Sequence, residues 1–464
     1  MQTEFQNTLF THDNLFVLHG MNSEIADLIY LDPPFNSKRT YSAPVGSKSA
    51  GASFKDMWTW QDINEAYLET LAGNYPEMVR YIENVGEISG KAMMSYLLYM
   101  AQRIIELHRI LKLTGSIYLH CDPTASHYLK LLLDYIFGKE NFRNEIVWER
   151  TTDTGSSKAR ANFFPRNNDI IFFYSKSKNY LHNKIYREYE PEYIDGKFQY
   201  EDDSGRYRWQ VLKNSSAETF QKLQQSDMLK KTEASKYYYY KQYLNNSKGV
   251  RLSSLWKADD ITPVSPNAKE STGYPTQKPL ALLHRIIKAS CPEGGVVLDP
   301  FCGCATTCVA AQQLGRKWVG IDIETKAVEV LVERLEGDGF IESESQQGLK
   351  FKQKGVDFIH LTNAPQRTDV KIEEITPQTK NDIKKRLFKQ QQGHCNGCNV
   401  ELEIQHFEID HIVPRAKGGG DYMENYQLLC GNCNRMKGAR PMEYLREKIK
   451  VRLSLMKNKV TFGE

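Results

Sequence analysis

Four consecutive residues carry groups that could activate an amine: Asp32, Pro33, Pro34 and Phe35. The lone pair of an exocyclic amine on a nucleobase is delocalised into the ring, which makes that amine a poor nucleophile. The Asp32 carboxylate can accept a hydrogen bond from one amine hydrogen, and the Pro33 carbonyl can accept one from the other. The two proline rings restrict the backbone and so hold that carbonyl in place. Phe35 offers a ring face on which an extruded base can stack. The tetrapeptide therefore predicts chemistry at a base amine, although Asp-Pro and Pro-Pro are also common turn formers.

A second segment, residues 298–307 (LDPFCGCATT), combines the end of an apolar run, a glycine-bearing turn and the start of a helical pattern, and the next apolar run ends at Asp322. This order is typical of a βαβ unit that binds a nucleoside, because the acid after the second strand accepts hydrogen bonds from ribose hydroxyls. A dinucleotide would need G-x-G-x-x-G, whereas this turn has only one glycine. S-adenosylmethionine has no pyrophosphate and fits the poorer glycine content. The predicted cofactor contacts here are Asp299, Phe301, Gly303 and Asp322.

Two Cys-x-x-Cys pairs near the end of the sequence have the spacing of metal ligands. They are Cys395 with Cys398 and Cys430 with Cys433. Four thiolates from two such pairs form a closed tetrahedral site, which is typical of structural zinc. The surrounding region is too small to form a stable hydrophobic core without an additional cross-link such as a bound metal ion. The sequence therefore predicts one bound Zn²⁺.

Polar residues between and after the cysteine pairs could cut a phosphodiester. The segment 408–414 reads EIDHIVP, and two asparagines follow at positions 425 and 434. An aspartate and a later asparagine could bind one hard divalent ion, with water and phosphate oxygens completing its shell. A neighbouring neutral histidine could take a proton from the attacking water.

Short apolar runs surround these segments. They are ADLIYL near residue 30, GSIYL near 118, DIIFFY near 172, GGVVL near 298 and KWVGI near 320. Each has the composition of a buried strand in a parallel sheet. Helical patterns lie between them at 93–112, 126–138, 279–290 and 306–314. The alternation predicts an open α/β sheet, in which ligands bind beyond the carboxyl ends of the strands.

The composition is that of a globular protein, with 40% hydrophobic and 25% charged residues, and 464 residues suffice for two or three domains. No run approaches the roughly 18 apolar residues of a membrane-spanning helix. The first residues lack the pattern of a signal peptide. These features argue against secreted and integral membrane classes and predict a cytoplasmic location.

Positive charge is concentrated in two stretches of a chain whose net charge is only +4. Residues 176–257 and residues 376–464 each contain 16 Lys and Arg against 10 Asp and Glu. The first stretch also holds 11 of the 26 tyrosines. Basic and aromatic side chains together suit phosphate contact and base stacking. Two surfaces that face a polyanion are expected, although solvated charged faces would give the same counts.

The motifs and their surroundings resemble the amino-methylating DNA methyltransferases, which act on adenine N6 or cytosine N4, in the permuted arrangement called the β class. The resemblance covers roughly residues 10–360. It includes Asp13-Asn14-Leu15, DPPF at 32–35, FKDMWTW at 54–60, GSIYLHCD at 115–122, NFRNEIVW at 141–148, NDIIFFYSKS at 168–177, TGYPTQKP at 272–279 and DPFCGCATT at 299–307. It implies a Rossmann-like α/β fold that binds S-adenosylmethionine and acts on double-stranded DNA, with residues 176–257 as the target-recognition region.

The same resemblance assigns roles to further residues. Asp13 contacts the cofactor adenine, and Thr276 and Lys278 flank the cofactor. Phe173 or Tyr174 helps to sandwich the flipped base. Asp rather than Ser at the head of the tetrapeptide favours adenine over cytosine as the target. Members of this class are often dimers, so a homodimer is expected.

The C-terminal segment, over about residues 386–440, resembles the HNH or ββα-metal endonucleases of the four-cysteine type. That resemblance makes His411 the general base and assigns Asp410 and Asn434 to a Mg²⁺ ion. It also implies that Asn425 ties down the loop between two strands. Many relatives have a histidine in place of the final asparagine, which leaves open that the module binds DNA without cutting it.

Together these predictions describe one polypeptide with two activities on DNA. We expect a methyltransferase domain at 1–360, a linker at 361–378 and a zinc-stapled HNH endonuclease domain at 379–464. The expected role is a combined restriction–modification or defence enzyme of a bacterium or phage. Two alternatives stay open: a modification methylase whose HNH module only binds DNA, and a nuclease that S-adenosylmethionine regulates.

Overall fold

The computed structural model of the chain describes residues 7–35, 39–43, 47, 49, 53–56, 71, 75–151, 162, 164, 166–233, 235–340, 358–370, 377–417, 419–440, 442, 444, 445, 448 and 449. Residues 57–60 of the FKDMWTW segment and residues 371–376 of the expected linker lie outside the described residues. The chain divides into two compact units, of which the second spans residues 183–253 and the first contains the rest.

In the described part of the first unit, the central element is a nine-stranded sheet with the order β14-β6-β7-β5-β2-β15-β16-β1-β17. Its strands are β1 (Thr8–Thr11), β2 (Ala26–Leu31), β5 (Leu111–Cys121), β6 (Phe142–Glu149), β7 (Asn168–Ser175), β14 (Leu255–Trp256), β15 (Val296–Asp299), β16 (Lys317–Asp322) and β17 (Ile359–Leu361). A separate hairpin pairs β3 (Arg39–Ser42) with β4 (Ser53–Asp56).

Most of the sheet is parallel, as the alternation of strands and helices predicts, but β7 is not. This strand runs antiparallel to both of its neighbours, β5 and β6. The prediction of a parallel strand near residue 172 is therefore wrong. A strand that is buried on both faces has a nearly continuous apolar sequence in either direction, so the pattern does not reveal its polarity.

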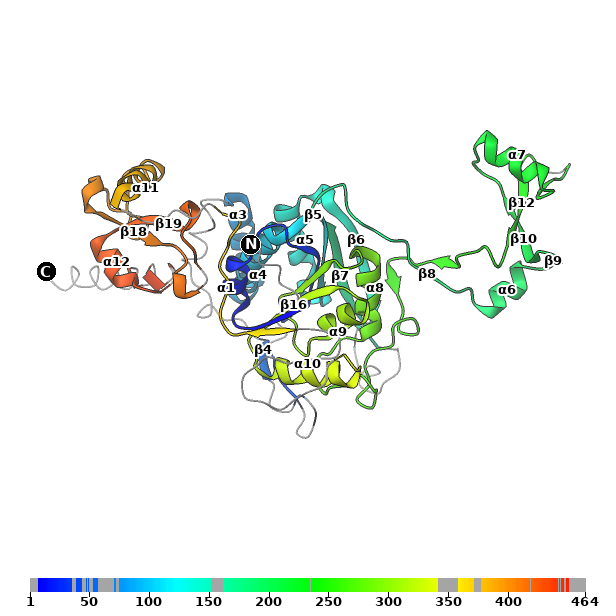
Figure 1. Cartoon of the computed structure of the whole chain (residues 1–464), viewed down its shortest axis with the longest axis horizontal. Coiled ribbons are helices and arrows are strands. Elements are labelled where there is room, and N and C mark those ends of the chain that lie inside the picture. The colour runs from blue at the N-terminus through cyan, green and yellow to red at the C-terminus, as the bar shows by residue number, and fades with distance from the viewer. Residues whose placement is uncertain are drawn as a thin grey trace. The chain divides into compact units, whose positions relative to one another are not determined.

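Helices cover both faces of the sheet (Figure 1). Successive residues of β2 alternate between two cores: Ile29 packs with α1, α3, α4 and α5, and Leu28 packs with α8, α9 and α10. The helices are α1 (Asn14–Gly20), α3 (Pro76–Ser89), α4 (Lys91–Ile110), α5 (Pro123–Phe137), α8 (Leu280–Ser290), α9 (Thr306–Gln313) and α10 (Lys326–Gly337). The four helices expected from the sequence are all present.

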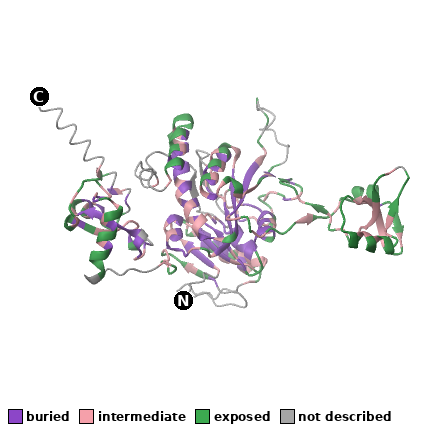
Figure 2. Cartoon of the chain, turned by 90° about the horizontal axis from the view of Figure 1, so that it is seen from above, coloured by how far each residue is buried: buried purple, intermediate pink, exposed green. Residues whose placement is uncertain are grey.

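The second unit, residues 183–253, is a small antiparallel sheet with two helices. Among its described residues the strand order is β11-β12-β10-β9. Its elements are β8 (Tyr186–Arg187), α6 (Pro191–Lys197), β9 (Tyr200–Asp202), β10 (Gly205–Val211), α7 (Ala217–Gln225), β11 (Leu229–Lys231), β12 (Tyr238–Tyr243) and β13 (Val250–Arg251). Figure 2 draws its strands largely as intermediate rather than buried, so this unit has little core of its own.

The C-terminal segment has a ββα arrangement with its own apolar core. It consists of α11 (Pro377–Gln390), the antiparallel strands β18 (Phe407–His411) and β19 (Tyr426–Cys430), and α12 (Gly431–Lys437). Short 3₁₀ turns lie at Ile404–His406, Arg415–Lys417 and Met423–Asn425, and another precedes β6 at Lys139–Asn141. Ile383 and Leu387 of α11 pack with Phe407 and Leu428.

The segment after residue 357 is tied to the sheet and to the turn after α1. Strand β17 pairs with β1 and crosses the expected domain boundary at 360. Further on, the Asn22 side chain accepts a hydrogen bond from the Thr368 amide (2.7 Å), and Asp369 accepts one from the Ser23 amide (2.8 Å). The first part of the expected linker is thus held by the methyltransferase-like half. No helix in the described ranges is long and apolar enough to cross a membrane.

Candidate active site and metal centre

A cavity of about 450 Å³ lies at the carboxyl ends of β2, β15 and β16. Parallel strands bring their carboxyl ends to one edge of a sheet, and the loops that follow them surround the space beyond. The residues predicted from the tetrapeptide and from the βαβ unit line this cavity, together with three residues predicted to contact the cofactor from other motifs. They are Asp13, Asp32, Pro33, Pro34, Phe35, Thr276, Lys278, Asp299, Phe301, Gly303 and Asp322.

Among the described residues, only one of the two oxygen atoms of the Asp32 carboxylate has a hydrogen-bond partner. The Lys278 ammonium donates a hydrogen bond to its Oδ2 atom, and lies 5.4 Å from the centre of the Phe35 ring. The Oδ1 atom of Asp32 is buried and has no hydrogen-bond partner among the described residues. Buried acceptors are normally satisfied, so this atom is ready for a donor that enters the cavity, such as an amine N–H.

The loop that carries Lys278 is held in an uncommon backbone conformation. Thr276 has φ of +64°, in the left-handed region that β-branched residues rarely adopt. The Thr276 carbonyl accepts a hydrogen bond from the Lys278 ammonium (3.3 Å). Such strain is typical of functional sites where surrounding structure fixes the chain. The resemblance places Lys278 beside the cofactor, whereas the structure pairs it with Asp32.

The two acids of the βαβ unit anchor its turns. Asp322 accepts hydrogen bonds from the Gly303 amide (2.7 Å) and the Glu324 amide (2.9 Å). Asp299 accepts one from the Phe301 amide (3.0 Å) and one from the Thr307 hydroxyl (2.5 Å). Burial raises the pKa of Asp299 to about 7 and that of Asp322 to about 6. Each carboxylate oxygen keeps a further lone pair, which a ribose hydroxyl can use.

Gly303 is the residue of this turn that must be small. It has φ of +52°, and a Cβ atom at this position would lie 3.0 Å from the Tyr274 ring. The turn therefore approaches Tyr274 closely without a side chain between them. This arrangement and the two acids fit a nucleoside cofactor without a pyrophosphate.

Two buried polar residues lie next to Asp13: Asn14, which the sequence analysis named only as part of a motif, and Arg103, which it did not name. Asp13 accepts a hydrogen bond from the Leu15 amide (2.9 Å) and so caps the start of α1. Arg103 donates to the Asn14 side chain (2.7 Å), and its guanidinium also lies 3.4 Å from Asp13. Arg103 lies among mostly apolar residues on the buried face of helix α4. A charge on the buried face of a helix was the available signal, because such a charge needs a partner.

The structure does not bring Phe173 or Tyr174 to the cavity. Both are buried in β7, and neither lines the cavity. The Phe173 ring stacks on Tyr118 at 4.5 Å, and the Tyr174 hydroxyl donates to Asp134 (2.7 Å) on the other face of the sheet. Phe35 is the aromatic residue of the tetrapeptide that does line the cavity.

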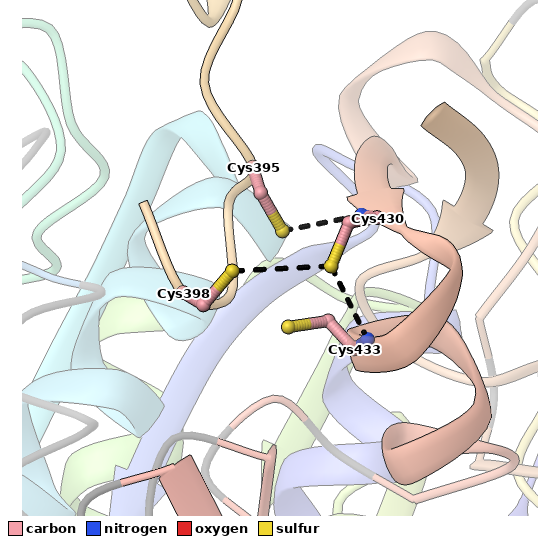
Figure 3. Close-up of side chains that lie close together, drawn as sticks. All are labelled: Cys395, Cys398, Cys430 and Cys433. Carbon is pink, nitrogen blue, oxygen red and sulfur yellow. Dashed lines mark hydrogen bonds between the residues drawn. The ribbon is translucent and has the colours of Figure 1, made fainter. Parts of the chain in front are cut away.

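The four cysteines predicted to bind zinc converge (Figure 3). Their sulfur atoms all lie within 4.8 Å of one another, as one bound ion requires. Backbone amides also point at the sulfurs: the Cys430 amide donates to Cys395 (3.2 Å) and the Cys433 amide to Cys430 (3.4 Å). A Cβ atom at Gly397 would lie only 2.9 Å from the Cys433 sulfur, so the loop leaves room for the cluster by having glycine there. The donor set fits Zn²⁺.

The two residues predicted to bind Mg²⁺, Asp410 and Asn434, have different hydrogen-bond partners. Asp410 accepts hydrogen bonds from Lys437 (2.9 Å) and Gln427 (2.8 Å), whereas Asn434 donates to Glu408. Asp410 and Glu408 are two residues apart on β18, so their side chains share a face of the strand.

His411 and Asn425 contact the loop that connects the two strands. The His411 Nε2 atom lies 2.7 Å from Asp421. Burial raises the pKa of Asp421, but hydrogen bonds from Arg415 and His411 outweigh it and hold that pKa below its usual value. The Asn425 side chain bonds to Val413 N (2.8 Å) and Val413 O (3.0 Å). Asp421 was not foreseen, because nothing in the sequence indicated that this loop folds back onto the histidine.

Comparison with known protein families agrees with this geometry. Residues 26–333 match the model of the DNA methylase family, and residues 395–440 match that of the HNH endonuclease family. The chain belongs to the DNA methylase family. The C-terminal match identifies the ββα module with its four cysteines as an HNH domain.

By name, the relatives of this methylase include methyltransferases and a subunit of a restriction–modification enzyme. Type II methyltransferase M.EcaI of Enterobacter cloacae is 28% identical over 357 residues, which are 71% of this chain and 69% of that protein. The Mod subunit of the type III restriction-modification enzyme StyLTI of Salmonella typhimurium is 26% identical over 67% of this chain and 50% of its own length. The DNA adenine methyltransferase YhdJ of Escherichia coli is 24% identical over 76% of this chain and 94% of its own length.

Solved structures show a weak likeness. The DNA modification methylase TTHA0409 of Thermus thermophilus has a TM-score of 0.37 at 15% identity and covers 77% of this methylase and all (100%) of that chain. The cytosine-N4-specific PvuII DNA methyltransferase has a TM-score of 0.41 at 12% identity, over 74% of this chain and 89% of its own.

Proposed function

We propose that the methylase half transfers a methyl group from S-adenosylmethionine to the exocyclic amine of a base in double-stranded DNA, with adenine N6 as the favoured acceptor. The observation that carries this proposal is the buried, unpartnered Asp32 Oδ1 atom beside the cavity of about 450 Å³. A buried acceptor without a donor is unfavourable, and a base amine supplies that donor. Asp at the head of the tetrapeptide and the likeness to the adenine methyltransferase YhdJ support adenine.

The tetrapeptide prepares the amine for attack. Asp32 Oδ1 accepts one amine hydrogen and the Pro33 carbonyl accepts the other, so the nitrogen lone pair leaves conjugation with the ring. Phe35 offers a stacking face for the flipped base. Lys278 fixes the carboxylate through Oδ2 and leaves Oδ1 for the substrate.

The cofactor site is formed by the other cavity residues. When bound, S-adenosylmethionine supplies a methyl group on a cationic sulfur. Asp322 accepts hydrogen bonds from the ribose, and the close turn at Gly303 leaves space for the nucleoside. The residues proposed to hold the cofactor are Asp13, Thr276, Asp299, Phe301, Gly303 and Asp322.

The second unit is proposed to contact DNA through one face of its sheet. Helices α6 and α7 both cover the opposite face, where Arg208 bonds to Tyr193 (2.6 Å) and Phe220 packs against Tyr238. The face without helices carries half-exposed aromatic rings with lysine ammonium groups near them. Rings and lysines of this kind stack on bases and neutralise phosphates. The side chains of this face include Tyr207, Trp209, Tyr243, Lys230 and Lys241.

The HNH domain is proposed to hydrolyse DNA phosphodiesters with Mg²⁺ or a similar ion, while Zn²⁺ holds its fold. Asp410 and Asn434 offer the oxygen ligands that a hard cation prefers. His411 is the general base: Asp421 occupies its Nε2 atom, which leaves Nδ1 for the attacking water.

The experiment combines both activities. Purified full-length chain is mixed with unmodified phage DNA and Mg²⁺, with and without S-adenosylmethionine, and both cut ends and methylated bases are scored. Methyl-adenine together with cleavage that prior methylation blocks supports a combined restriction–modification enzyme. Methylation without cutting reduces the HNH domain to a DNA-binding module. Cleavage that needs the cofactor but survives Asp32→Ala points to a nuclease regulated by S-adenosylmethionine. Sedimentation of the same preparation tests the expected homodimer.

A further inference from the structure

A buried hydrogen-bonded chain of side chains leads from the cavity towards the surface, and no role has been assigned to its members above, although two of them, His120 and Asp169, lie within the motifs at 115–122 and 168–177. Tyr30 lines the cavity, and its hydroxyl lies 2.8 Å from His120 Nδ1. His120 Nε2 lies 3.2 Å from Asp169 Oδ2, and the Asp169 Oδ1 atom lies 3.0 Å from Arg150 Nε. His120 is fully buried (0% exposed), whereas the Arg150 side chain is 46% exposed.

The sheet topology explains how these residues meet. Tyr30 in β2 pairs with Tyr118 in β5, and His120 lies two residues further along β5 on the same face. Strand β7 is antiparallel, so its first residues lie beside the carboxyl end of β5. Asp169 therefore reaches the same edge of the sheet as the catalytic tetrapeptide. A parallel β7 would have placed this acid at the opposite edge.

The hydrogen-bond roles follow from Asp169. Burial raises the pKa of this carboxyl, but the hydrogen bond from His120 and the charges of Lys278 and Arg150 outweigh it and hold that pKa below its usual value. Asp169 is thus a carboxylate, which can only accept. It receives the Nε2 hydrogen, and the Nδ1 lone pair of neutral His120 accepts the Tyr30 hydroxyl hydrogen. The lone pairs of the Tyr30 oxygen remain for the cavity.

We propose that Tyr30, through His120 and Asp169, takes up the proton that the base amine loses on methylation; this rests on the proposed methyltransferase activity. An acid, an imidazole and a hydroxyl in this order form a base-assisted hydroxyl. The amine nitrogen forms its bond to the methyl carbon as the carbon–sulfur bond breaks, and the electron pair of that bond stays on sulfur. The proton of the methylated amine passes to the Tyr30 oxygen, and the tyrosine's own proton passes to His120 Nδ1.

The imidazolium formed in this step faces the Asp169 carboxylate, and the proton returns to solvent by the reverse path after the product leaves. Asp32 is less suited to this task, because Lys278 already binds its Oδ2 atom. The charged and titratable groups that face this chain come from several elements. Asp32 and Asp299 at the cavity act on Tyr30, and Lys278, Arg150, Cys121 and Asp122 act on or interact with Asp169. The uncharged rings of Phe35 and Trp148 complete its surroundings.

The test variant is Tyr30→Phe, which keeps the buried ring and removes the hydroxyl. Tyr118→Phe is a matched control, because Tyr118 is the register partner of Tyr30, is equally buried (2% exposed), and bonds to Ser290 (2.7 Å) away from the cavity. Single-turnover methylation is measured with full-length protein preloaded with S-adenosylmethionine and saturating DNA, from about pH 5.5 to pH 9.

We expect Tyr30→Phe to lower the single-turnover rate about 10-fold or more, as loss of a general base does, with unchanged affinities for DNA and cofactor. The pH profile of the wild-type rate should differ from that of Tyr30→Phe, because only the wild-type protein can pass the amine proton through the Tyr30 hydroxyl to His120. Tyr118→Phe should behave as wild type. Asp169→Asn should slow the rate as Tyr30→Phe does, because the imidazolium loses its counter-charge.

Two results overturn the relay. Equal rates and equal pH profiles for Tyr30→Phe and Tyr118→Phe would show that the hydroxyl takes no part, while the methyltransferase activity itself would stand. A loss that appears only as weaker binding of DNA or cofactor would show a structural role. Absence of methylation by the wild-type protein would instead refute the proposed function on which the relay rests.

Discussion

Acidification should weaken cofactor binding through Asp322, at the end of β16. This carboxyl has a pKa of about 6, because burial opposes its charge more strongly than the amides of Gly303 and Glu324 favour it. A ribose hydroxyl bonds more strongly to the ionised carboxylate than to the neutral acid, which has fewer acceptor sites and an O–H of its own. Binding that prefers the ionised form is linked to loss of a proton below pH 6, so the affinity at pH 5 should be up to about ten times weaker than at neutral pH.

The raised pKa of Asp322 also affects the stability of the fold. A salt-bridged acid, whose pKa is lowered, stabilises the fold at high pH, whereas Asp322 stabilises it at low pH. The folded chain holds the Asp322 proton more tightly than the unfolded chain does, so this carboxyl contributes stability at low pH. That contribution is lost as the pH rises from about 4 to about 6, and amounts to at most about 3 kcal/mol. Cofactor that binds the ionised acid should offset the loss, so the thermal stabilisation by cofactor should grow with pH over this range.

Calorimetric titration of the full-length chain at pH 7.5, 6 and 5 measures the effect, and Asp322→Asn is the control that cannot ionise. The variant should bind weakly and lose this component of the pH dependence. S-adenosylhomocysteine, which has the same ribose but no sulfonium charge, should show the same trend. An affinity of wild-type protein that stays constant between pH 7.5 and pH 5 would refute the assignment of Asp322 as a buried ribose acceptor.

Four substitutions test the remaining assignments. Asp32→Ala should lower methylation by about 100-fold or more, as measured by methyl incorporation, and leave cofactor affinity largely intact because Asp32 is not among the residues proposed to hold the cofactor. His411→Ala should abolish DNA cleavage in a nicking assay without releasing zinc, because the ring lies outside the four-cysteine cluster. Cys398→Ser should release zinc, measured by metal analysis, and unfold the C-terminal module while methylation persists. Trp209→Ala should weaken DNA binding about 10-fold, as loss of one stacking ring does, whereas Gln210→Ala on the opposite face of the sheet should not.

For each substitution, one outcome would contradict the role assigned to the residue. Near-normal methyl transfer by Asp32→Ala would remove the carboxylate from the mechanism. Equal cutting by wild type and His411→Ala would place the nuclease site elsewhere. Loss of both activities in Cys398→Ser would mean that the two halves form one folding unit, and equal DNA binding by the Trp209 and Gln210 variants would move the DNA contact away from this sheet.

The site motifs, the cysteine cluster and the helices could be predicted from the sequence, because each depends on residues that are close together along the chain. The tetrapeptide after β2 and the glycine-bearing turn after β15 follow apolar strands, and parallel strands must bring such segments to one edge of the sheet. The cysteine pairs converge because four thiolates at this spacing can share one ion. The helices were predictable because their apolar periodicity is continuous over several turns.

The tertiary structure alone decided the pairings between residues that are distant along the chain. Lys278 and Asp32 are 246 residues apart, and no pattern around either residue indicates the other. The antiparallel direction of β7 carried Asp169 to His120, because the polarity of a strand depends on the connections outside it. Residue types and short spacings thus determined which chemistry this protein can perform. The register and direction of neighbouring strands decided which side chains meet to perform it, since these depend on contacts that no local segment encodes.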